Sequence, residues 1–470
     1  MSSQCKEKLL ALNRREYGET YNRLRWVTSD EAEKASQERQ RILGALTSKA
    51  RFAFHDTKIS SGPLSPGCHL CGAGSWSCLF INSLCNARCF YCPSEQTSRS
   101  EPTTNGIVFA HPQDYLDYLE RFGFAGVSIS GGEPFLTFDK TLLFVSKIKR
   151  KFGSGMYVWV YTNGIAATRE KLERLRDAGL DEIRFDISAQ GYRLENLRMG
   201  TAVIKTAAVE IPVIPEDEDR LKTLLFHLED IGVKHLNLHD LRCTTHNCTH
   251  LMQRGYRFLH GSKVTILDSE LAALRLIDEA RDQGIKLPIH YCSFIYKERF
   301  QTSGHRKRLA KFCSKPFESI TDVGAIRRIS LKTEPQEREG IVRKFEAAGL
   351  DRGLWRVEAD SHVLQVHEQL LPYLMTDPCS LFLSYFVPVL LPAVSYRFPF
   401  EEIALSRKRN VVIERHPALK EKKIERQTLQ RLLTGSDRSE HAWVSEKKDE
   451  PPSEEILEWE KVGWGLQDYF

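Results

Sequence analysis

The sequence predicts an α/β protein built on a partial or full (β/α) barrel, and three observations lead to this fold class. Between about residues 75 and 292, short apolar segments alternate with amphipathic helical segments. Three glycines at nearly equal spacing, Gly179, Gly232 and Gly284, end helical segments in the way left-handed glycines do. Repetition of strand and helix implies parallel strands joined by right-handed crossovers, which curve into a barrel.

Seven segments are expected to form the strands of this sheet. They are short and rich in β-branched residues, as strands covered on both faces of a parallel sheet are. The expected strands span residues 78–82, 126–130, 157–162, 182–187, 209–214, 235–239 and 287–291. A helix beginning near Asp217 places Leu221, Leu225 and Leu228 on one stripe that faces the sheet. In such barrels, ligands bind at the carboxyl ends of the strands.

Composition and pattern divide the 470 residues into four parts. After the barrel the pattern changes to an expected strand, helix and strand, which indicates an α+β domain. The four parts are a helical N-terminal extension (residues 1–60), the barrel (61–312), the C-terminal α+β domain (313–435, with strands at 325–331 and 354–358 and a helix at 334–348) and a charged tail (436–470).

Charge and hydropathy exclude several function classes. The net charge is only +5, but residues 406–431 are strongly basic and residues 436–460 are strongly acidic. Such blocks favour solvated helix faces or a mobile tail, and no aromatic platform accompanies the basic block, so nucleic-acid binding is not expected. The longest apolar run, residues 381–396, contains two prolines and is too short to cross a bilayer, so we expect buried core there and no membrane contact.

Three cysteines, Cys85, Cys89 and Cys92, have the spacing C-x3-C-x2-C. Cysteine fills 12 of 470 positions, so chance would give this triple spacing roughly 0.01 times in such a chain. Three thiolates are one fewer than a closed tetrahedral metal site needs, whereas an iron–sulfur cubane held by three thiolates keeps one iron open. The alternative is a zinc knuckle or a set of buried thiols. The absence of an export signal predicts a cytoplasmic protein whose cysteines are thiols or metal ligands.

Polar and glycine residues follow the next expected strands. Gly131, Gly132, Glu133 and Pro134 end the second, Thr162 and Asn163 the third, and Ser188 the fourth. The carboxyl ends of parallel strands meet at one edge of the sheet, so these residues should lie near the cysteines. The cysteine spacing together with Gly-Gly-Glu-Pro resembles the radical S-adenosylmethionine (radical SAM) enzymes, over roughly residues 60–315.

This resemblance implies a [4Fe-4S] cluster on the three cysteines, with SAM bound at its open iron and cleaved to a 5′-deoxyadenosyl radical. It implies that Tyr91 lies along the adenine, that residues 131–134 meet the methionyl amine, and that Glu133 pairs with the ammonium. Further implied SAM contacts are Thr162, Asn163 and Ser188, at the carboxylate or ribose, and Val213, packed on the adenine.

Other cysteines and histidines allow a second site. Cys68 and Cys71 form a C-x2-C pair on an expected turn, which suits half of a zinc, iron or second cluster site, and Cys78, Cys292 or Cys313 could complete it. The alternative is an inert pair. A second group, His239, His246 and His250 with Cys243 and Cys248, resembles a metal cluster, but a substrate-facing loop is the preferred interpretation.

The resemblance is nearest to a branch related to pyruvate formate-lyase activating enzymes, which shares the lead-in over residues 62–71. We weigh three functions. The first is modification of a protein or peptide side chain by cobalamin-dependent C-methylation, as in the methylases of methyl-coenzyme M reductase, including its glutamine C-methyltransferase. These carry an added C-terminal domain, but this chain lacks their Asp-x-His-x-x-Gly cobalamin motif. The second is a glycyl-radical-enzyme activase, and the third a non-enzymatic iron–sulfur or nucleic-acid-binding protein. A ferredoxin or flavodoxin is the expected electron donor of the first two.

Overall fold

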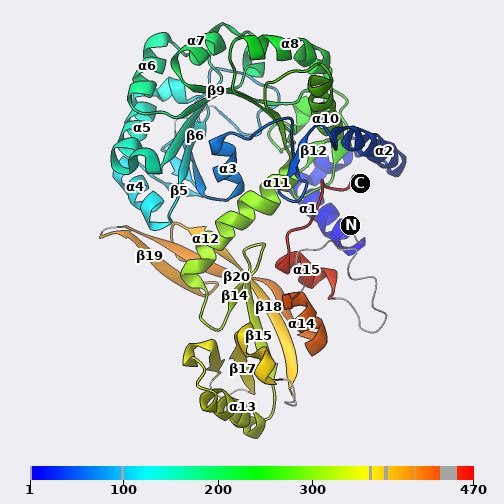
Figure 1. Cartoon of the computed structure of the whole chain (residues 1–470), viewed down its shortest axis with the longest axis vertical. Coiled ribbons are helices and arrows are strands. Elements are labelled where there is room, and N and C mark those ends of the chain that lie inside the picture. Colours follow the sequence, from blue (N-terminus) through cyan, green and yellow to red (C-terminus); the bar gives the residue numbers. More distant parts are fainter. Residues whose placement is uncertain (1–2, 97–99, 359–361, 375–378, 408, 435–451) are drawn as a thin grey trace. The chain divides into compact units, whose positions relative to one another are not determined.

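A computed structural model describes residues 3–96, 100–358, 362–374, 379–407, 409–434 and 452–470 (Figure 1). The chain forms two compact units. The N-terminal unit comprises Met1–Glu298 with Gly465–Phe470, and the C-terminal unit comprises Arg299–Trp464. Residues 435–451, which include much of the expected charged tail, lie outside the described residues.

Parallel strands in chain order form the centre of the N-terminal unit. They are β3 (Trp76–Asn82), β6 (Gly126–Gly131), β7 (Tyr157–Thr162), β8 (Glu182–Phe185), β9 (Thr206–Pro212), β10 (His235–His239) and β13 (Ile289–Cys292). Within the described residues the sheet is open, since its two end strands do not pair with each other. The predicted α/β fold with a partial (β/α) barrel is therefore confirmed.

Helices connect these strands and cover the outer face of the curved sheet (Figure 1). They are α4 (Pro112–Arg121), α5 (Phe138–Phe152), α6 (Arg169–Asp177), α7 (Glu195–Val203), α8 (Glu218–Asp230) and α10 (Leu267–Asp282). The three regularly spaced glycines follow α6, α8 and α10 with φ of +90°, +83° and +72°, which confirms their predicted role at helix ends.

Short strands extend the sheet at both edges. Before the barrel, α1 (Ser3–Tyr17) and α2 (Ser29–Leu46) are followed by β1 (Arg51–Ala53) and β2 (Lys58–Ser60), and β2 pairs antiparallel with β13. At the other edge, β4 (Thr103–Thr104) and β5 (Ile107–Val108) form a hairpin beside β3. The sequence analysis did not predict these strands, because two or three residues carry no readable alternation.

One short helix, α3 (Pro66–Gly72), lies on the inner side of the sheet (Figure 1). The Ser65 hydroxyl caps it by accepting from Cys68 N at 3.2 Å, and Pro66 occupies its first position. The C-x2-C pair therefore lies on a helix and not on the expected turn. The sequence already held the reason, since Ser-Pro is a helix-start signal.

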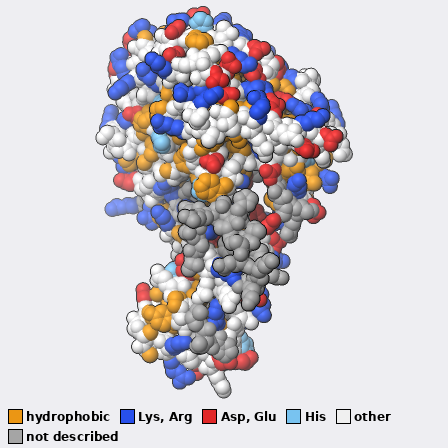
Figure 2. All heavy atoms as spheres, turned by 45° about the vertical axis from the view of Figure 1, so that its right-hand side comes forward, with side chains coloured by type: hydrophobic (Ala, Val, Ile, Leu, Met, Phe, Trp, Pro, Cys, Tyr) orange, Lys and Arg blue, Asp and Glu red, His pale blue; other side chains and the backbone are white. Residues whose placement is uncertain are grey.

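The loops at the carboxyl ends of the later strands contain α9 (Cys248–Met252), β11 (Phe258–Leu259), β12 (Thr265–Ile266) and α11 (Phe294–Tyr296). Lys, Arg, Asp and Glu side chains are interspersed over the visible face of this unit (Figure 2). Within the described ranges, no helix has both the length and the apolar character needed to cross a bilayer.

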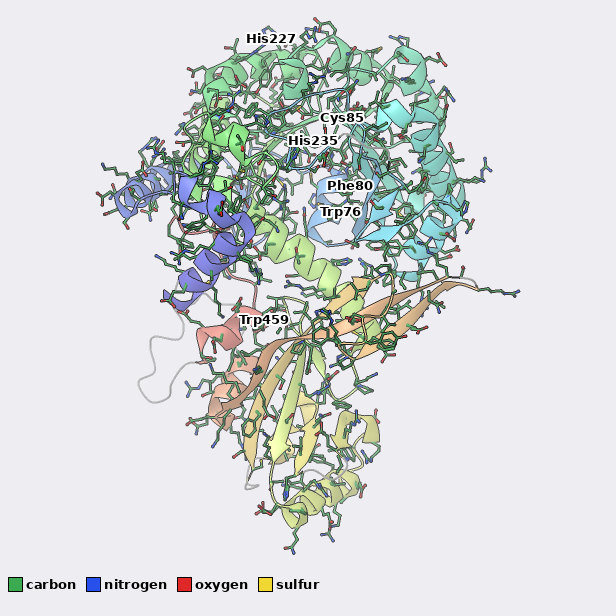
Figure 3. The ribbon with its side chains drawn as sticks, turned by 180° about the vertical axis from the view of Figure 1, so that it is seen from behind. Trp76, Phe80, Cys85, His227, His235 and Trp459 are labelled. Carbon is green, nitrogen blue, oxygen red and sulfur yellow. The ribbon has the colours of Figure 1, made fainter. Side chains whose placement is uncertain are left out.

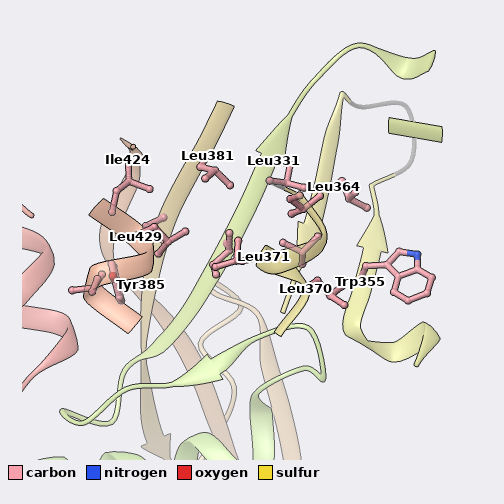
Figure 4. Close-up of a cluster of buried hydrophobic side chains, with 14 of the residues drawn as sticks. Leu331, Trp355, Leu364, Leu370, Leu371, Leu381, Tyr385, Ile424 and Leu429 are labelled. Atoms are coloured by element: carbon pink, nitrogen blue, oxygen red, sulfur yellow. The ribbon is translucent and has the colours of Figure 1, made fainter. Parts of the chain in front are cut away.

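The C-terminal unit is a largely antiparallel sheet with helices. Its strands are β14 (Ser319–Ile320), β15 (Ile326–Lys332), β16 (Trp355–Val357), β17 (Val363–Val366), β18 (Ser380–Leu391), β19 (Phe400–Ser406) and β20 (Arg409–Ile424), and its helices are α12 (Ser303–Cys313), α13 (Pro335–Ala347), α14 (Arg426–Thr434) and α15 (Glu454–Glu460). Leu331, Leu381 and Tyr385 belong to its buried core (Figure 4).

One segment of this unit contradicts the expectation from the sequence, and another agrees with it. The basic block over residues 406–431 was expected to form solvated helix faces or a tail, but most of it is strand β20, whose residues Val411 to Arg415 are buried. The apolar run 381–396 supplies most of β18, with alternate residues buried, as expected of core. The net charge of the block does not reveal the apolar stretch that begins at Val411, and burial of that stretch makes the segment a strand.

Candidate active site

The three motif cysteines lie together in the loop that follows β3. Figure 3 shows Trp76, Phe80 and Cys85 in succession along β3 and this loop. Cys85, Cys89 and Cys92 are each half-buried. Two N–H groups already point at one sulfur: Cys85 Sγ accepts from Ala87 N at 3.4 Å and from Asn163 Nδ2 at 3.5 Å. Such N–H···S contacts also stabilise sulfur atoms that ligate iron.

The electrostatics of the three thiols suit a cationic cluster. Burial raises the pKa of each thiol, that of Cys89 to about 12, and negative charge on neighbouring thiols raises the pKa of Cys85 and Cys89 further. Thiolates this close need a cation, and iron provides it. Among the described residues no three His, Cys, Asp or Glu side chains converge tightly enough for a single metal ion. A four-iron cluster spaces its ligands more widely, so the donor set fits it.

Gly131 and Gly132 bring the second strand end directly against the cysteine loop. Gly132 N donates to Asn82 O at 2.9 Å, and Glu133 N donates to Leu84 O at 2.6 Å. A Cβ on Gly131, whose φ is +124°, would lie 2.2 Å from Asn82 O, and one on Gly132 would lie 2.0 Å from Leu84 O. Only glycine permits this approach, which fixes the start of the cysteine loop.

Glu133 is fully buried and joins two strand ends. Its Oε1 accepts from Phe135 N at 2.9 Å and from Thr162 Oγ1 at 2.8 Å, and its Oε2 accepts from Asn163 N at 2.7 Å. Pro134, also buried, begins the short helix η2 (Pro134–Thr137). In this structure Glu133 therefore positions Thr162 and Asn163, and the pairing with an ammonium stays a prediction.

Burial raises the pKa of Glu133 to about 7, although three hydrogen bonds oppose the rise. The folded state then binds more protons than the unfolded one, so this group's contribution to stability is present below pH 4.5 and is lost as pH rises through about 7. The free energy of unfolding of the wild type, relative to Glu133→Gln, should fall by up to about 3 kcal/mol between pH 5 and pH 8. Urea unfolding of both proteins across that range measures the slope, and parallel pH profiles would contradict the assignment.

Tyr91 and Ser188 meet at a carboxylate that the sequence analysis did not assign. Tyr91 Oη donates to Asp186 Oδ2 at 3.0 Å and lies 2.6 Å from Ser188 Oγ. Burial raises the pKa of Asp186, and burial together with the negative charge of Asp186 raises the pKa of Tyr91. Val213, directly after β9, is fully buried, and its carbonyl accepts from Ser269 Oγ at 2.7 Å.

The loop after β10 also holds the cysteine loop. Asn247 Nδ2 donates to Tyr91 O at 3.0 Å, and Thr244 Oγ1 donates to Pro93 O at 2.9 Å. Like Asp186, these residues were missed. Asp186 could have been found, because it follows a strand at the ligand edge, whereas Asn247 and Thr244 lie in a loop whose path the sequence does not reveal.

Cys68 and Cys71 lie on the inner side of the barrel beside a buried lysine. Cys68 Sγ is 3.4 Å from His290 Nε2, and the charges of Cys68, Cys71 and Cys292 all act on Lys58, which is 1% exposed. Burial opposes ionisation of Cys292, but Lys58, Lys297 and His239 outweigh it and lower its pKa to about 5. The Lys58 ammonium therefore favours the thiolate of Cys292, whereas burial raises the pKa of Cys68 and Cys71, and a second metal at those two cysteines stays a prediction.

The remaining cysteines and histidines that were candidates for a second site do not lie together. Cys78 lies on β3, where burial raises its pKa to about 11, and Cys313 belongs to the C-terminal unit. Cys243 and Cys248 are buried in an apolar cluster, whereas His246 and His250 are exposed. His239 contacts Glu210 and Lys297 instead, so the structure does not bring this histidine–cysteine group together.

Comparison with known proteins agrees with this geometry. The family model described as "Radical SAM superfamily" matches residues 80–222, which run from β3 into α8. The chain carries a radical SAM domain. The family implies a four-iron cluster and SAM as cofactors, and the cysteine loop and the Gly131–Gly132 contact lie within the matched residues.

One relative is the Methanocaldococcus jannaschii protein named "Putative glycyl-radical enzyme activating enzyme MJ0021", 29% identical over 277 residues, which cover 56% of this chain and 72% of that protein. Similar solved structures include Streptococcus suis SuiB (13% identity, TM-score 0.34, covering 62% of this chain and 60% of that one) and anSMEcpe with bound AdoMet and Cp18Cys peptide (14%, 0.26, 34% and 48%). The match spans less than two thirds of each of these solved chains.

Proposed function

We propose that this protein is a radical SAM enzyme that abstracts a hydrogen atom from an amino-acid residue of a protein or peptide. The observation that carries the proposal is the cysteine loop, in which three thiols interact with one another and the residues at its start lie against Gly131 and Gly132. When bound, the cluster and SAM supply one-electron cleavage to a 5′-deoxyadenosyl radical. A ferredoxin or flavodoxin would deliver that electron.

The chain's own residues would ligate the cluster, orient SAM and exclude water from the site. Cys85, Cys89 and Cys92 would hold the cluster, with Asn163 donating to the Cys85 sulfur. Glu133 Oε2 accepts a hydrogen bond from the backbone N–H of Asn163 and so holds Asn163 in place. Tyr91, Asp186 and Ser188 form one hydrogen-bonded group beside the cysteines, suited to the polar edges of an adenosyl group.

Protein or peptide as substrate is supported by the name of the M. jannaschii relative, since a glycyl-radical enzyme is itself a protein. Glycyl-radical activation needs only the residues described above. Cobalamin-dependent C-methylation, the second candidate, is favoured by the presence of the C-terminal unit, a domain for which activation alone assigns no task.

The test is anaerobic reconstitution with iron and sulfide, chemical reduction, and chromatography for 5′-deoxyadenosine and methionine. We expect about four irons per chain and formation of both products. Absence of both products from a protein that has bound its cluster would overturn the proposal. Corrin absorbance after cobalamin addition, together with S-adenosylhomocysteine formation, would favour methylation over activation.

A further inference from the structure

Two cationic side chains share one phenyl ring at the edge of the sheet where the cysteine loop lies. Lys297 Nζ is 4.5 Å from the centroid of Phe294, and Arg242 Cζ is 5.9 Å from it. Arg242 follows β10, and Phe294 and Lys297 follow β13, so both loops leave carboxyl ends of parallel strands. This is the end of a barrel at which substrates bind.

The lysine is held in place from inside the barrel. Lys297 Nζ donates to His239 Nδ1 at 2.8 Å, and the opposite ring nitrogen, Nε2, lies 2.5 Å from Glu210 Oε1. If His239 Nδ1 accepts, its proton is on Nε2 and is donated to Glu210. A buried carboxylate therefore orients the histidine, and the histidine orients the ammonium.

Arg242, which is partly buried, differs from Arg184 and Arg39 of the same unit, whose side chains pair with carboxylates. Arg184 pairs with Glu182 and Glu210, and Arg39 pairs with Glu270. Arg242 Nε, in contrast, is buried and donates no hydrogen bond to any described residue. A buried donor without an acceptor costs about 1–3 kcal/mol, so this Nε–H is suited to an acceptor from outside the chain.

One amide links this arginine to the cysteine loop. Asn247 Nδ2 donates both to Arg242 O, at 2.9 Å, and to Tyr91 O, at 3.0 Å, so the two backbone segments are neighbours. Tyr91 directly precedes the cluster ligand Cys92. The SAM contacts implied by the resemblance follow β3, β6, β7, β8 and β9, whereas Arg242 follows β10, a strand end to which no SAM contact is assigned.

We propose that Arg242 and Lys297 bind a carboxylate of the substrate, so that the enzyme acts on a peptide segment with an acidic side chain beside the target residue. The inference rests on the proposed function. A guanidinium binds a carboxylate through two parallel hydrogen bonds, and the ammonium, which contacts the same phenyl ring, adds a second positive charge nearby. The carboxylate of SAM has the same chemistry, and the experiment separates the two sources.

The cluster-loaded protein would be titrated with acetyl-Gly-Glu-Gly-amide, with acetyl-Gly-Gln-Gly-amide and, separately, with SAM, using ligand-observed NMR and calorimetry. We expect the Glu peptide to bind the wild type about tenfold more tightly than the Gln peptide. Arg242→Gln should abolish this preference, and Arg242→Lys, which keeps the charge, should retain part of it. The matched control is Arg198→Gln, on the exposed face of α7.

Equal binding of the two peptides by the wild type would overturn the proposal. So would a tenfold loss of SAM affinity in Arg242→Gln with the peptide preference intact, because the carboxylate would then be that of SAM. The peptide titration needs no turnover. A wild type that prefers the Glu peptide but forms no 5′-deoxyadenosine would therefore contradict the proposed function and leave this binding site standing.

Discussion

Alanine at Cys85, Cys89 and Cys92 together is expected to abolish cluster binding and, with it, all SAM cleavage. Three thiolates are the fewest that can hold a cubane with one open iron, and the triple substitution leaves this loop without any of them. The reconstituted triple variant should lack the visible absorbance of an iron–sulfur protein and should give no 5′-deoxyadenosine above a blank without enzyme.

The control for this experiment is Cys379→Ala, at a half-buried cysteine of the C-terminal unit. It should bind iron and cleave SAM as the wild type does. The triple variant should also keep the wild-type circular dichroism, since the three thiols are half-buried and lie in a loop. SAM cleavage that survives the triple substitution would contradict the assignment of these cysteines.

Gly132→Ala should reduce SAM cleavage almost as much as the triple cysteine substitution does, although it removes no cluster ligand. The added methyl would lie 2.0 Å from Leu84 O, a backbone atom that cannot turn away, so the strand end and the cysteine loop must separate. We expect about 3 kcal/mol or more of lost stability. Formation of 5′-deoxyadenosine should fall by at least about a hundredfold, because displacement of about 1 Å is enough to misplace reacting groups.

Gly44→Ala is the matched control, because a Cβ there meets nothing within 4 Å and Gly44 lies in helix α2. It should gain up to about 1 kcal/mol of stability, as alanine does in a helix, and keep wild-type activity. Urea unfolding and product chromatography on both variants give the comparison. Wild-type activity in Gly132→Ala would show that the close approach of the two loops is not needed.

The sequence predicted the barrel well because its strands and helices have a strong local signal. The strands expected at 157–162 and 235–239 match β7 and β10 residue for residue, and the other five overlap their observed counterparts. The strands β18, β19 and β20 were missed because charged residues conceal the apolar stretch around Val411, and because β18 pairs with β20 and not with the strand that follows it in the chain. Non-local pairing of this kind leaves little trace in a window of ten residues.

The residues of the candidate site also divide into those that the local sequence predicts and those that depend on contacts between distant segments. Cys85, Gly131 and Glu133 could be read from spacing alone, because the chemistry fixes both residue type and position. Asn247 and Arg242 could not, since their proximity to the cysteine loop depends on how a loop without regular structure returns over the sheet. The position of Lys58 beside Cys68 and Cys71 could not be read from the sequence either, because it lies on β2, a strand of three residues.

The antiparallel pairing of β2 with β13 has a consequence for how the chain is made. Lys58 to Ser60 emerge from the ribosome early, but their partners at 290–292 emerge more than two hundred residues later. During that interval Ile59, which is fully buried in the folded chain, has only the short strand β1 as a partner, while the rest of the sheet assembles in order of synthesis. Slow translation through α10 would prolong the period in which β2 lacks its partner β13. Chaperones are expected to bind stalled chains during this period and to release them once β13 has been made.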